Sequence, residues 1–180
     1  MSEASGVHSR TWRPAIALAI LGVVVLAAIV FFVRRGAGQS VTPEALAAAR
    51  KTWEKIGIDD YDLEWMASGR VTAHYYVTVR GSKVQKIESI APDGRRFEVH
   101  PGEPRFYSVE GLFTTIADEL AQLKEPEPFG QPKDTKVVMR FTPDPKLGYP
   151  VSYRRNVLGT TQGLAIDVIR LIPVKKGATG

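Results

Sequence analysis

Twenty consecutive residues near the amino terminus carry neither a charge nor a strongly hydrogen-bonding side chain, which constrains this chain more than any other feature. The segment runs from Pro14 to Val33 and reads PAIALAILGVVVLAAIVFFV. At a rise of about 1.5 Å per residue, a helix of this length spans about 30 Å, the thickness of a bilayer's hydrocarbon core. We therefore expect a single transmembrane helix at residues 14–33, with the lipid bilayer as its partner.

A cleaved signal peptide is the alternative for this segment, but its apolar region is normally about 7–15 residues and ends at a small-residue cleavage site. The run here is longer and ends in Phe-Phe-Val-Arg-Arg, which suits a stop at the membrane interface. Orientation follows the arginines close to the span, and these are balanced: Arg10 and Arg13 precede it, Arg34 and Arg35 follow it. Charge alone therefore leaves the orientation of this single-pass protein open.

The distribution of charge argues against a nucleic-acid partner. The net charge is +5, and residues 1–40 supply +3 of it through four arginines against one glutamate. Residues 41–180 hold the other 20 basic residues against 18 acidic ones, a near-neutral balance that makes a poor footprint for phosphate binding. The chain has no cysteine, which excludes disulfides, thiolate zinc sites and a cysteine nucleophile.

Two helices are predicted in the remainder of the chain. Thr42-Pro43-Glu44 supplies a hydroxyl cap, a proline in the first helical turn and an early acid, and Gly57 ends the apolar stripe that follows. Ser108 caps the second helix, whose stripe includes Leu112 and Ile116. The predicted organisation is a polar tail (1–13), the membrane segment (14–33), a flexible tether (34–41), one domain (42–173) and a frayed tail (174–180).

Alternating apolar and polar residues predict the strands. The alternation in the last of them slips near Val168–Ile169, which indicates a β-bulge. Consecutive strands are joined by hairpin signals, with no repeating strand–helix–strand unit, so we expect an α+β domain. Its antiparallel sheet should have about six or seven strands and be covered on one face by the two helices. The predicted strands are residues 61–68, 71–80, 83–90, 95–100, 137–141, 151–156 and 164–172.

Several motifs resemble an uncharacterised bacterial family of small exported or membrane-anchored proteins, classed as a domain of unknown function. They are Trp53 before IDDYDLEW, VTVRGSKV, the helix start YSVEGLFTTIADEL, and VVMRFTPDPKLGYPVSYRRN. The resemblance covers residues 50–172 and implies a fold and an extracytoplasmic location, but no activity. Many members have a close pair of cysteines after the first strand, where this chain has Met66-Ala-Ser-Gly69, so any disulfide-linked feature is absent.

The sequence contains no motif for catalysis, cofactor binding or metal binding. His8, His74 and His100 lack the spacing of a metal site, although His74 and His100 are both predicted on the solvated face of the sheet. Ser108 and Ser152 lack the context of an activated nucleophile. The acidic cluster at 59–64 lacks the loop pattern of a calcium site. A glycosidase-type carboxylate pair is left open, because such pairs meet only in three dimensions.

One face of the predicted sheet is basic and aromatic. Arg140, Arg154 and Arg170 lie one on each of the three late strands and are expected to share a face with His74 and Tyr76. Such a face would suit anionic lipid headgroups or an acidic partner. The alternative is the ordinary solvated face of a half-exposed antiparallel sheet.

The second candidate feature is the corner DPKLGYP, residues 144–150. Asp144 is placed to bond backbone amides beyond it, and Gly148 can take a left-handed conformation. Pro150 can begin the next strand without needing to donate a ladder hydrogen bond. The pattern predicts a corner that sets the register of two strands. Tyr149 either packs under a helix or contacts a ligand at the rim.

These features lead to a functional hypothesis without an assigned activity. We expect a membrane-anchored, extracytoplasmic, non-catalytic binding or envelope-associated module, whose partner is an envelope protein or an anionic surface. The alternatives are an uncharacterised hydrolase with His74 as general base, or an inhibitor-like or scaffold protein. An acid or a hydroxyl within about 3 Å of His74 would favour the hydrolase, and a sheet face without a pocket would oppose it.

Overall fold

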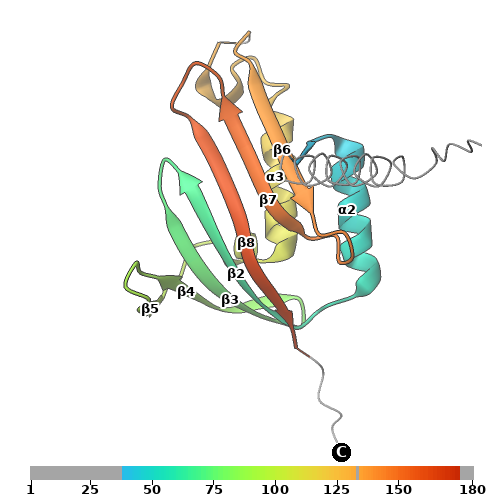
Figure 1. Cartoon of the computed structure of the whole chain (residues 1–180), viewed down its shortest axis with the longest axis vertical. Coiled ribbons are helices and arrows are strands. Elements are labelled where there is room, and N and C mark those ends of the chain that lie inside the picture. Colours follow the sequence, from blue (N-terminus) through green and yellow to red (C-terminus); the bar gives the residue numbers. More distant parts are fainter. Residues whose placement is uncertain (1–37, 133, 175–180) are drawn as a thin grey trace, which may run out of the picture. The chain divides into compact units, whose positions relative to one another are not determined.

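Eight antiparallel strands form one sheet in the described part of the chain, residues 38–132 and 134–174 of a computed structural model (Figure 1). Their order across the sheet is β1-β6-β7-β8-β2-β3-β4-β5. Two α-helices, α2 (Pro43–Ile56) and α3 (Val109–Gln122), accompany it. The strands are β1 (Gln39–Ser40), β2 (Tyr61–Gly69), β3 (Ala73–Arg80), β4 (Lys83–Ile90), β5 (Arg96–Glu98), β6 (Val137–Pro143), β7 (Pro150–Val157) and β8 (Gly163–Pro173).

The sequence-based prediction of the fold is wrong in its number of strands. The sheet has eight strands, not six or seven, because Gln39 and Ser40 pair with Phe141 and Arg140. These two residues lie in the segment 34–41 that the sequence assigned to a tether, and two residues are too few to show alternation. No helix of the described residues is long and apolar enough to cross a membrane. The predicted transmembrane segment, residues 14–33, lies outside the described residues.

Two meanders build the sheet and meet at its centre. One consists of β2 to β5 and the other of β6 to β8, and the antiparallel pairing of β8 with β2 joins them. The chain leaves the first meander at β5, passes through a short 3-10 helix, η1 (Pro104–Tyr107), and α3, and enters the second at β6. In Figure 1 the strands turn from steep in β6–β8 to nearly horizontal in β4, the usual twist of an antiparallel sheet.

Both helices begin where the sequence predicts. The Thr42 side chain accepts a hydrogen bond from the backbone N–H of Ala45 at 3.1 Å, and Gly57 ends α2 with a left-handed φ of +66°. Ser108 Oγ accepts from the N–H of Gly111 at 3.1 Å and caps α3 in the same way. The two N-caps therefore fix where each helix begins. The apolar residues of both helices point at the sheet.

The core lies between one face of the sheet, here called the inner face, and the two helices. Figure 1 shows α3 behind β6 and β7 and α2 beside them. Within the described residues no helix lies over the opposite face, here called the outer face. The buried cluster includes Leu63, Val77, Phe141 and Tyr153 of the sheet with Trp53, Leu112, Phe113 and Ile116 of the helices.

A β-bulge in β8 changes the face on which its residues lie. Val168 pairs with Trp65 and Arg170 pairs with Glu64, so Ile169 is the extra residue between two adjacent partners of β2. Without the bulge, residues 168 and 170 would share a face, because side chains alternate along a strand. With it, Val168 is buried in the core while Arg170 lies on the outer face. The slip near Val168–Ile169 is thus confirmed, and it positions a charged side chain.

Candidate functional site

The strand register brings the predicted basic and aromatic residues onto the outer face. Arg140 of β6 is the direct partner of Arg154 of β7. Arg170 of β8 and Tyr76 of β3 are both partners of Glu64, one on each side of β2. His74 lies two residues from Tyr76 on the same strand and therefore on the same face.

Glu64 is the centre of this arrangement, although the sequence pointed to it only as a member of the acidic cluster at 59–64. It is only 9 % exposed. Its Oε1 lies 2.9 Å from His74 Nε2, and its Oε2 accepts a hydrogen bond from Arg170 Nε at 2.7 Å. Hydrogen bonds to ionised groups are among the strongest in proteins, so three neighbouring strands are tied together here. Asp62, Glu64, His74, Tyr76 and Arg170 are called the Glu64 network below.

Tyr76 links the other members of the Glu64 network to Arg96 of β5. Its hydroxyl donates to Asp62 Oδ2 at 3.1 Å. The guanidinium carbons of Arg96 and Arg170 lie 4.2 Å and 5.9 Å from the centre of its ring, within the range of cation–π contacts. Burial, followed by the hydrogen bond to Asp62, raises the pKa of Tyr76. The ring is therefore held as a neutral phenol in contact with two cations.

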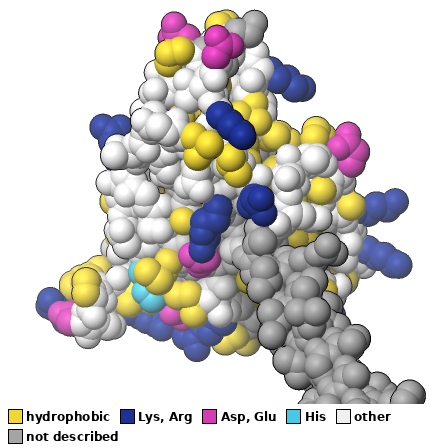
Figure 2. All heavy atoms as spheres, turned by 45° about the horizontal axis from the view of Figure 1, so that its top comes forward, with side chains coloured by type: hydrophobic (Ala, Val, Ile, Leu, Met, Phe, Trp, Pro, Cys, Tyr) yellow, Lys and Arg dark blue, Asp and Glu magenta, His cyan; other side chains and the backbone are white. Residues whose placement is uncertain are grey.

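Arg80, Arg154 and Arg170 of the outer face are each paired with an acid, so much of the positive charge that the sequence suggested is balanced. Arg80 pairs with Asp62 at 2.9 Å, and Arg154 pairs with Asp167 at 2.6 Å. Arg154 also donates to the carbonyl of Ile166. In Figure 2 the basic, acidic and hydrophobic side chains are interspersed on the face shown and form no continuous basic patch.

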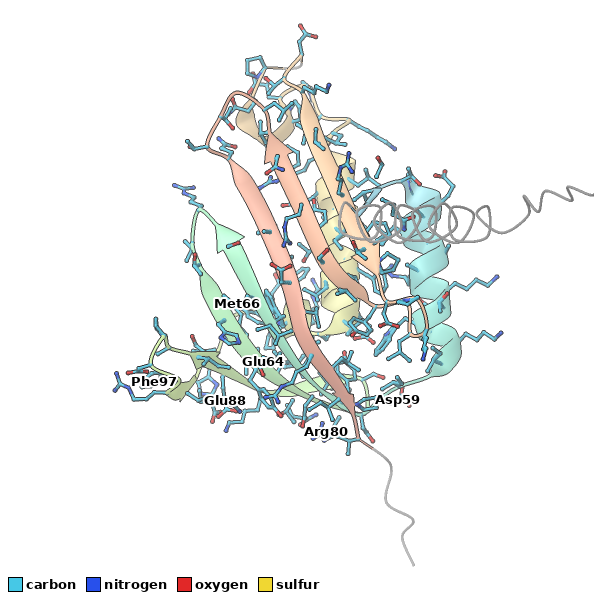
Figure 3. The ribbon with its side chains drawn as sticks, viewed as in Figure 1. Asp59, Glu64, Met66, Arg80, Glu88 and Phe97 are labelled. Carbon is cyan, nitrogen blue, oxygen red and sulfur yellow. The ribbon has the colours of Figure 1, made fainter. Side chains whose placement is uncertain are left out.

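The Glu64 network lies toward one end of the sheet and lines none of the four cavities given below. Figure 3 labels Glu64 and Met66 on β2, Arg80 on β3 and Glu88 on β4, all on neighbouring strands. We describe four cavities, of about 440, 320, 440 and 680 Å³, and neither Glu64 nor His74 lines any of them. Across residues 38–132 and 134–174, no group of three or more His, Cys, Asp or Glu residues is arranged to hold a metal ion.

Two of the predicted neighbours on the outer face do not meet. His100 follows β5 and its Nε2 lies 3.8 Å from Glu98 Oε1, whereas His74 belongs to the Glu64 network. The acidic cluster at 59–64 also divides. Asp59 and Asp60 accept hydrogen bonds from Ser82 Oγ and Gly81 N of the β3–β4 turn, at 2.8 Å and 2.6 Å, while Asp62 and Glu64 point to the outer face.

The corner at 144–150 is a structural joint between β6 and β7. Asp144 Oδ1 accepts from the backbone N–H groups of Lys146 and Leu147, at 2.8 Å and 2.7 Å. Gly148 has a φ of +82°, and a Cβ there would lie 2.5 Å from the carbonyl oxygen of Ala49 in α2. The corner is therefore pressed against a helix.

Tyr149 and Pro150 complete this joint. The ring of Tyr149 packs edge-on against Trp53 of α2, with ring centres 6.3 Å apart, so it packs against a helix and does not form a rim contact. Pro150 is fully buried at the start of β7. Burial, followed by the charge of Asp144, raises the pKa of the Tyr149 hydroxyl. None of these residues points to a ligand.

Arg155, Glu119 and Phe129 form a polar site on the inner face that the sequence analysis missed. Arg155 follows Arg154 in the strand, so it points to the opposite face, toward α3. Alternation within VSYRRN was the available signal. Tyr153 and Arg155 are two residues apart in the strand, so both side chains are expected on the same face. Phe129 and Glu119 carried no signal of their own, since their meeting depends on the packing of a loop and a helix.

Comparison of the chain with protein-family models, with curated proteins and with solved structures finds no match. The resemblance of residues 50–172 to the exported bacterial family stays a prediction carried by the motifs alone. The functional argument therefore rests on the geometry of the outer face and of the cavities.

Proposed function

We propose that this chain is a non-catalytic binding module whose outer face docks on a protein partner. The observation that carries the proposal is the Glu64 network: charged side chains held by short hydrogen bonds on a sheet face that no helix of the described residues covers, away from every cavity described above. Rigid, pre-arranged polar groups favour specific recognition, because little side-chain freedom is lost on binding.

The composition of the outer face favours a protein over a lipid surface. Anionic headgroups attract an excess of unpaired cations. Here Arg80, Arg154 and Arg170 are each paired with an acid. Apolar side chains lie among the pairs, such as Ile172, which is 44 % exposed beside Asp62. A mixture of satisfied ion pairs and exposed aliphatic groups is typical of a protein interface.

We further propose that residues 14–33 attach the module to a membrane and that the module faces away from the cytoplasm. The length and apolarity of that segment support the attachment, and the family resemblance supports the orientation. Protease treatment of intact cells tests the orientation. Digestion before the membrane is opened is the expected result, and protection until the membrane is broken would place the domain in the cytoplasm.

Site-directed photo-crosslinking in cells tests the docking surface. A photoreactive residue replaces Met66, which lies on the outer face beside His74, and the matched control replaces Glu54, an exposed residue of α2. We expect one discrete protein adduct from position 66 that disappears when Arg170→Glu is added, and no such adduct from position 54. Adducts to lipid alone, or the same adducts from both positions, would contradict the proposal.

One observation favours a hydrolase as the second candidate. Glu64 lies 2.9 Å from His74, the arrangement that orients an imidazole as a general base. Against this, His74 lines none of the four cavities and no serine belongs to the Glu64 network. Hydrolysis of p-nitrophenyl acetate by the full chain decides the matter. A hydrolase would lose its turnover in His74→Gln, and equal rates in the two proteins would remove this candidate.

A further inference from the structure

The largest of the four cavities lies at the far end of the sheet, where β2 ends and β8 begins. Its volume is about 680 Å³, within the range of cavities that hold small organic ligands. It is bounded on one side by a short 3-10 helix, η2 (Pro128–Gly130). The lining includes Arg70, Phe129, Arg155 and Gln162, together with Gly69 and Gly163. We call it the Arg155 cavity.

The guanidinium of Arg155 lies between Phe129 and Glu119, but within the described residues its Nε makes no hydrogen bond. Its Cζ lies 4.1 Å from the centre of the Phe129 ring, and its Nε is 3.5 Å from Glu119 Oε2, close enough for an ion pair. The side chain is only 15 % exposed, and Nε is buried without a hydrogen bond. Because a guanidinium has five N–H donors, and buried donors are nearly always paired, this group has unused capacity for an acceptor.

Two residues in the walls of the cavity have backbone positions that few residue types can occupy. Phe129 has a φ of +56°, a conformation that side chains other than glycine rarely adopt, and this places its ring over Arg155. On the other side, a Cβ at Gly69 would lie 2.3 Å from the carbonyl oxygen of Gly163. Strained positions of this kind persist where the surrounding structure holds them, and they are concentrated at ligand sites.

We propose that the Arg155 cavity binds a small organic monocarboxylate with an apolar body. The planar fork of an arginine matches a carboxylate with two parallel hydrogen bonds. Glu119 beside Arg155 already supplies one negative charge. A ligand with two negative charges of its own, such as a phosphate dianion, would therefore be repelled more strongly than a monocarboxylate. The ring of Phe129 offers an apolar surface for the body of the ligand, and Arg70 adds an exposed cation at the mouth.

Ligand-observed NMR titration of the full chain tests this site with benzoate as the probe. We expect saturable binding in the millimolar range, and no binding of benzamide, which has the same shape without the charge. Arg155→Met should weaken benzoate binding by about tenfold or more, because the fork is lost. Arg95→Met is the matched control, since Arg95 also lies over a phenylalanine ring, Phe97, but outside the cavity. It should change the affinity by less than about twofold.

A second variant separates recognition from folding. Phe129→Gly relieves the strain of the positive φ, so this variant should fold even if Arg155→Met does not. It also removes the apolar wall of the cavity, so the affinity for benzoate should fall by about fivefold. The site is overturned by benzoate failing to bind, by equal binding of benzamide, or by unchanged affinity in Phe129→Gly. Tighter binding of inorganic phosphate than of benzoate would likewise overturn the monocarboxylate assignment.

Discussion

The two faces of the sheet hold their polar groups in opposite ways. On the outer face, acids pair with cations of neighbouring strands, as in Glu64 with Arg170 and Asp62 with Arg80. On the inner face, carboxylates accept hydrogen bonds from neutral aromatic donors. Glu110 accepts from Trp53 Nε1 and the Tyr61 hydroxyl, at 2.8 Å and 2.9 Å. Polar groups thus bridge strands on one face and link helices to the sheet on the other.

Glu64 and Glu119 make this comparison sharpest, because their side chains are almost equally buried, 11 % and 13 % exposed. Glu64 has a guanidinium N–H at 2.7 Å and an imidazole at 2.9 Å. Glu119 has the Tyr153 hydroxyl at 2.5 Å, and its cation lies farther away, at 3.5 Å. Burial raises the pKa of Glu119, although both partners act in the other direction. Depth in the protein does not by itself decide how a carboxylate is stabilised; its partners do.

The largest expected effect comes from crowding the inner face at the corner. Gly148→Ala forces a side chain into a left-handed φ of +82° and places its Cβ 2.5 Å from a backbone oxygen of α2. The combined penalty should be about 4 kcal/mol in the free energy of unfolding, measured with urea. Gly81→Ala is the control: its φ of +56° is also left-handed, but nothing lies within 4 Å of the added Cβ. It should lose only about 1 kcal/mol. Equal losses would show that the corner is not pressed against α2.

The next effect compares the two carboxylates directly. Glu119→Leu leaves the Tyr153 hydroxyl without its acceptor and the nearly buried Arg155 without its counter-ion, so the unfolding free energy should fall by about 3 kcal/mol. Glu64→Leu should lose only about 1 kcal/mol, because the side chain of Arg170 is 50 % exposed and can turn to water. Chemical denaturation of both variants measures the difference. A larger loss of unfolding free energy for Glu64→Leu would show that the outer-face carboxylate, not the inner-face one, contributes more to stability.

Local elements of this fold are predictable from sequence because their signals are local. The cap at Thr42, the left-handed Gly57 and the bulge beside Ile169 each depend on a few adjacent residues. The strand β1 is different. Its two residues acquire strand geometry only by pairing with β6, about 100 residues later, and no pattern within Gln39–Ser40 records that partner.

The candidate sites divide in the same way. Alternation placed His74 and Tyr76 on one face, since the period of a regular strand is fixed, and the bulge at Ile169 put Arg170 on that face as well. Alternation could not identify Glu64 as their shared acid, because the register between β2 and β8 depends on contacts across the sheet. The Arg155 cavity was still less predictable. It brings together a strand, a helix and a loop residue with an unusual φ, and each looks ordinary in the linear sequence.

A smaller effect tests whether the Glu64 network is coupled across strands. A double-mutant cycle with Glu64→Gln and Arg170→Gln should give an interaction energy of about 1 kcal/mol, since the pair is hydrogen-bonded at 2.7 Å but half exposed on the arginine side. The control cycle combines Glu103→Gln with Arg105→Gln, a pair in which both side chains are well exposed. Its interaction energy should lie near zero. Equal values in the two cycles would mean that the network adds no rigidity to the outer face.

The smallest effect concerns pH and isolates the inner face. Burial raises the folded pKa of Glu119 above its usual value of 4.5, so between that value and the raised pKa the native state binds more protons than the unfolded state. The free energy of unfolding contributed by Glu119 therefore falls as pH rises through this window, and the loss is complete above the raised pKa. Glu119→Gln keeps an acceptor for the Tyr153 hydroxyl and has no proton to lose. The stability of the wild type relative to this variant should decline as urea unfolding is repeated at increasing pH from about 4 upward. A relative stability that instead increased with pH would mean that attraction to Arg155 outweighs burial at the inner-face carboxylate.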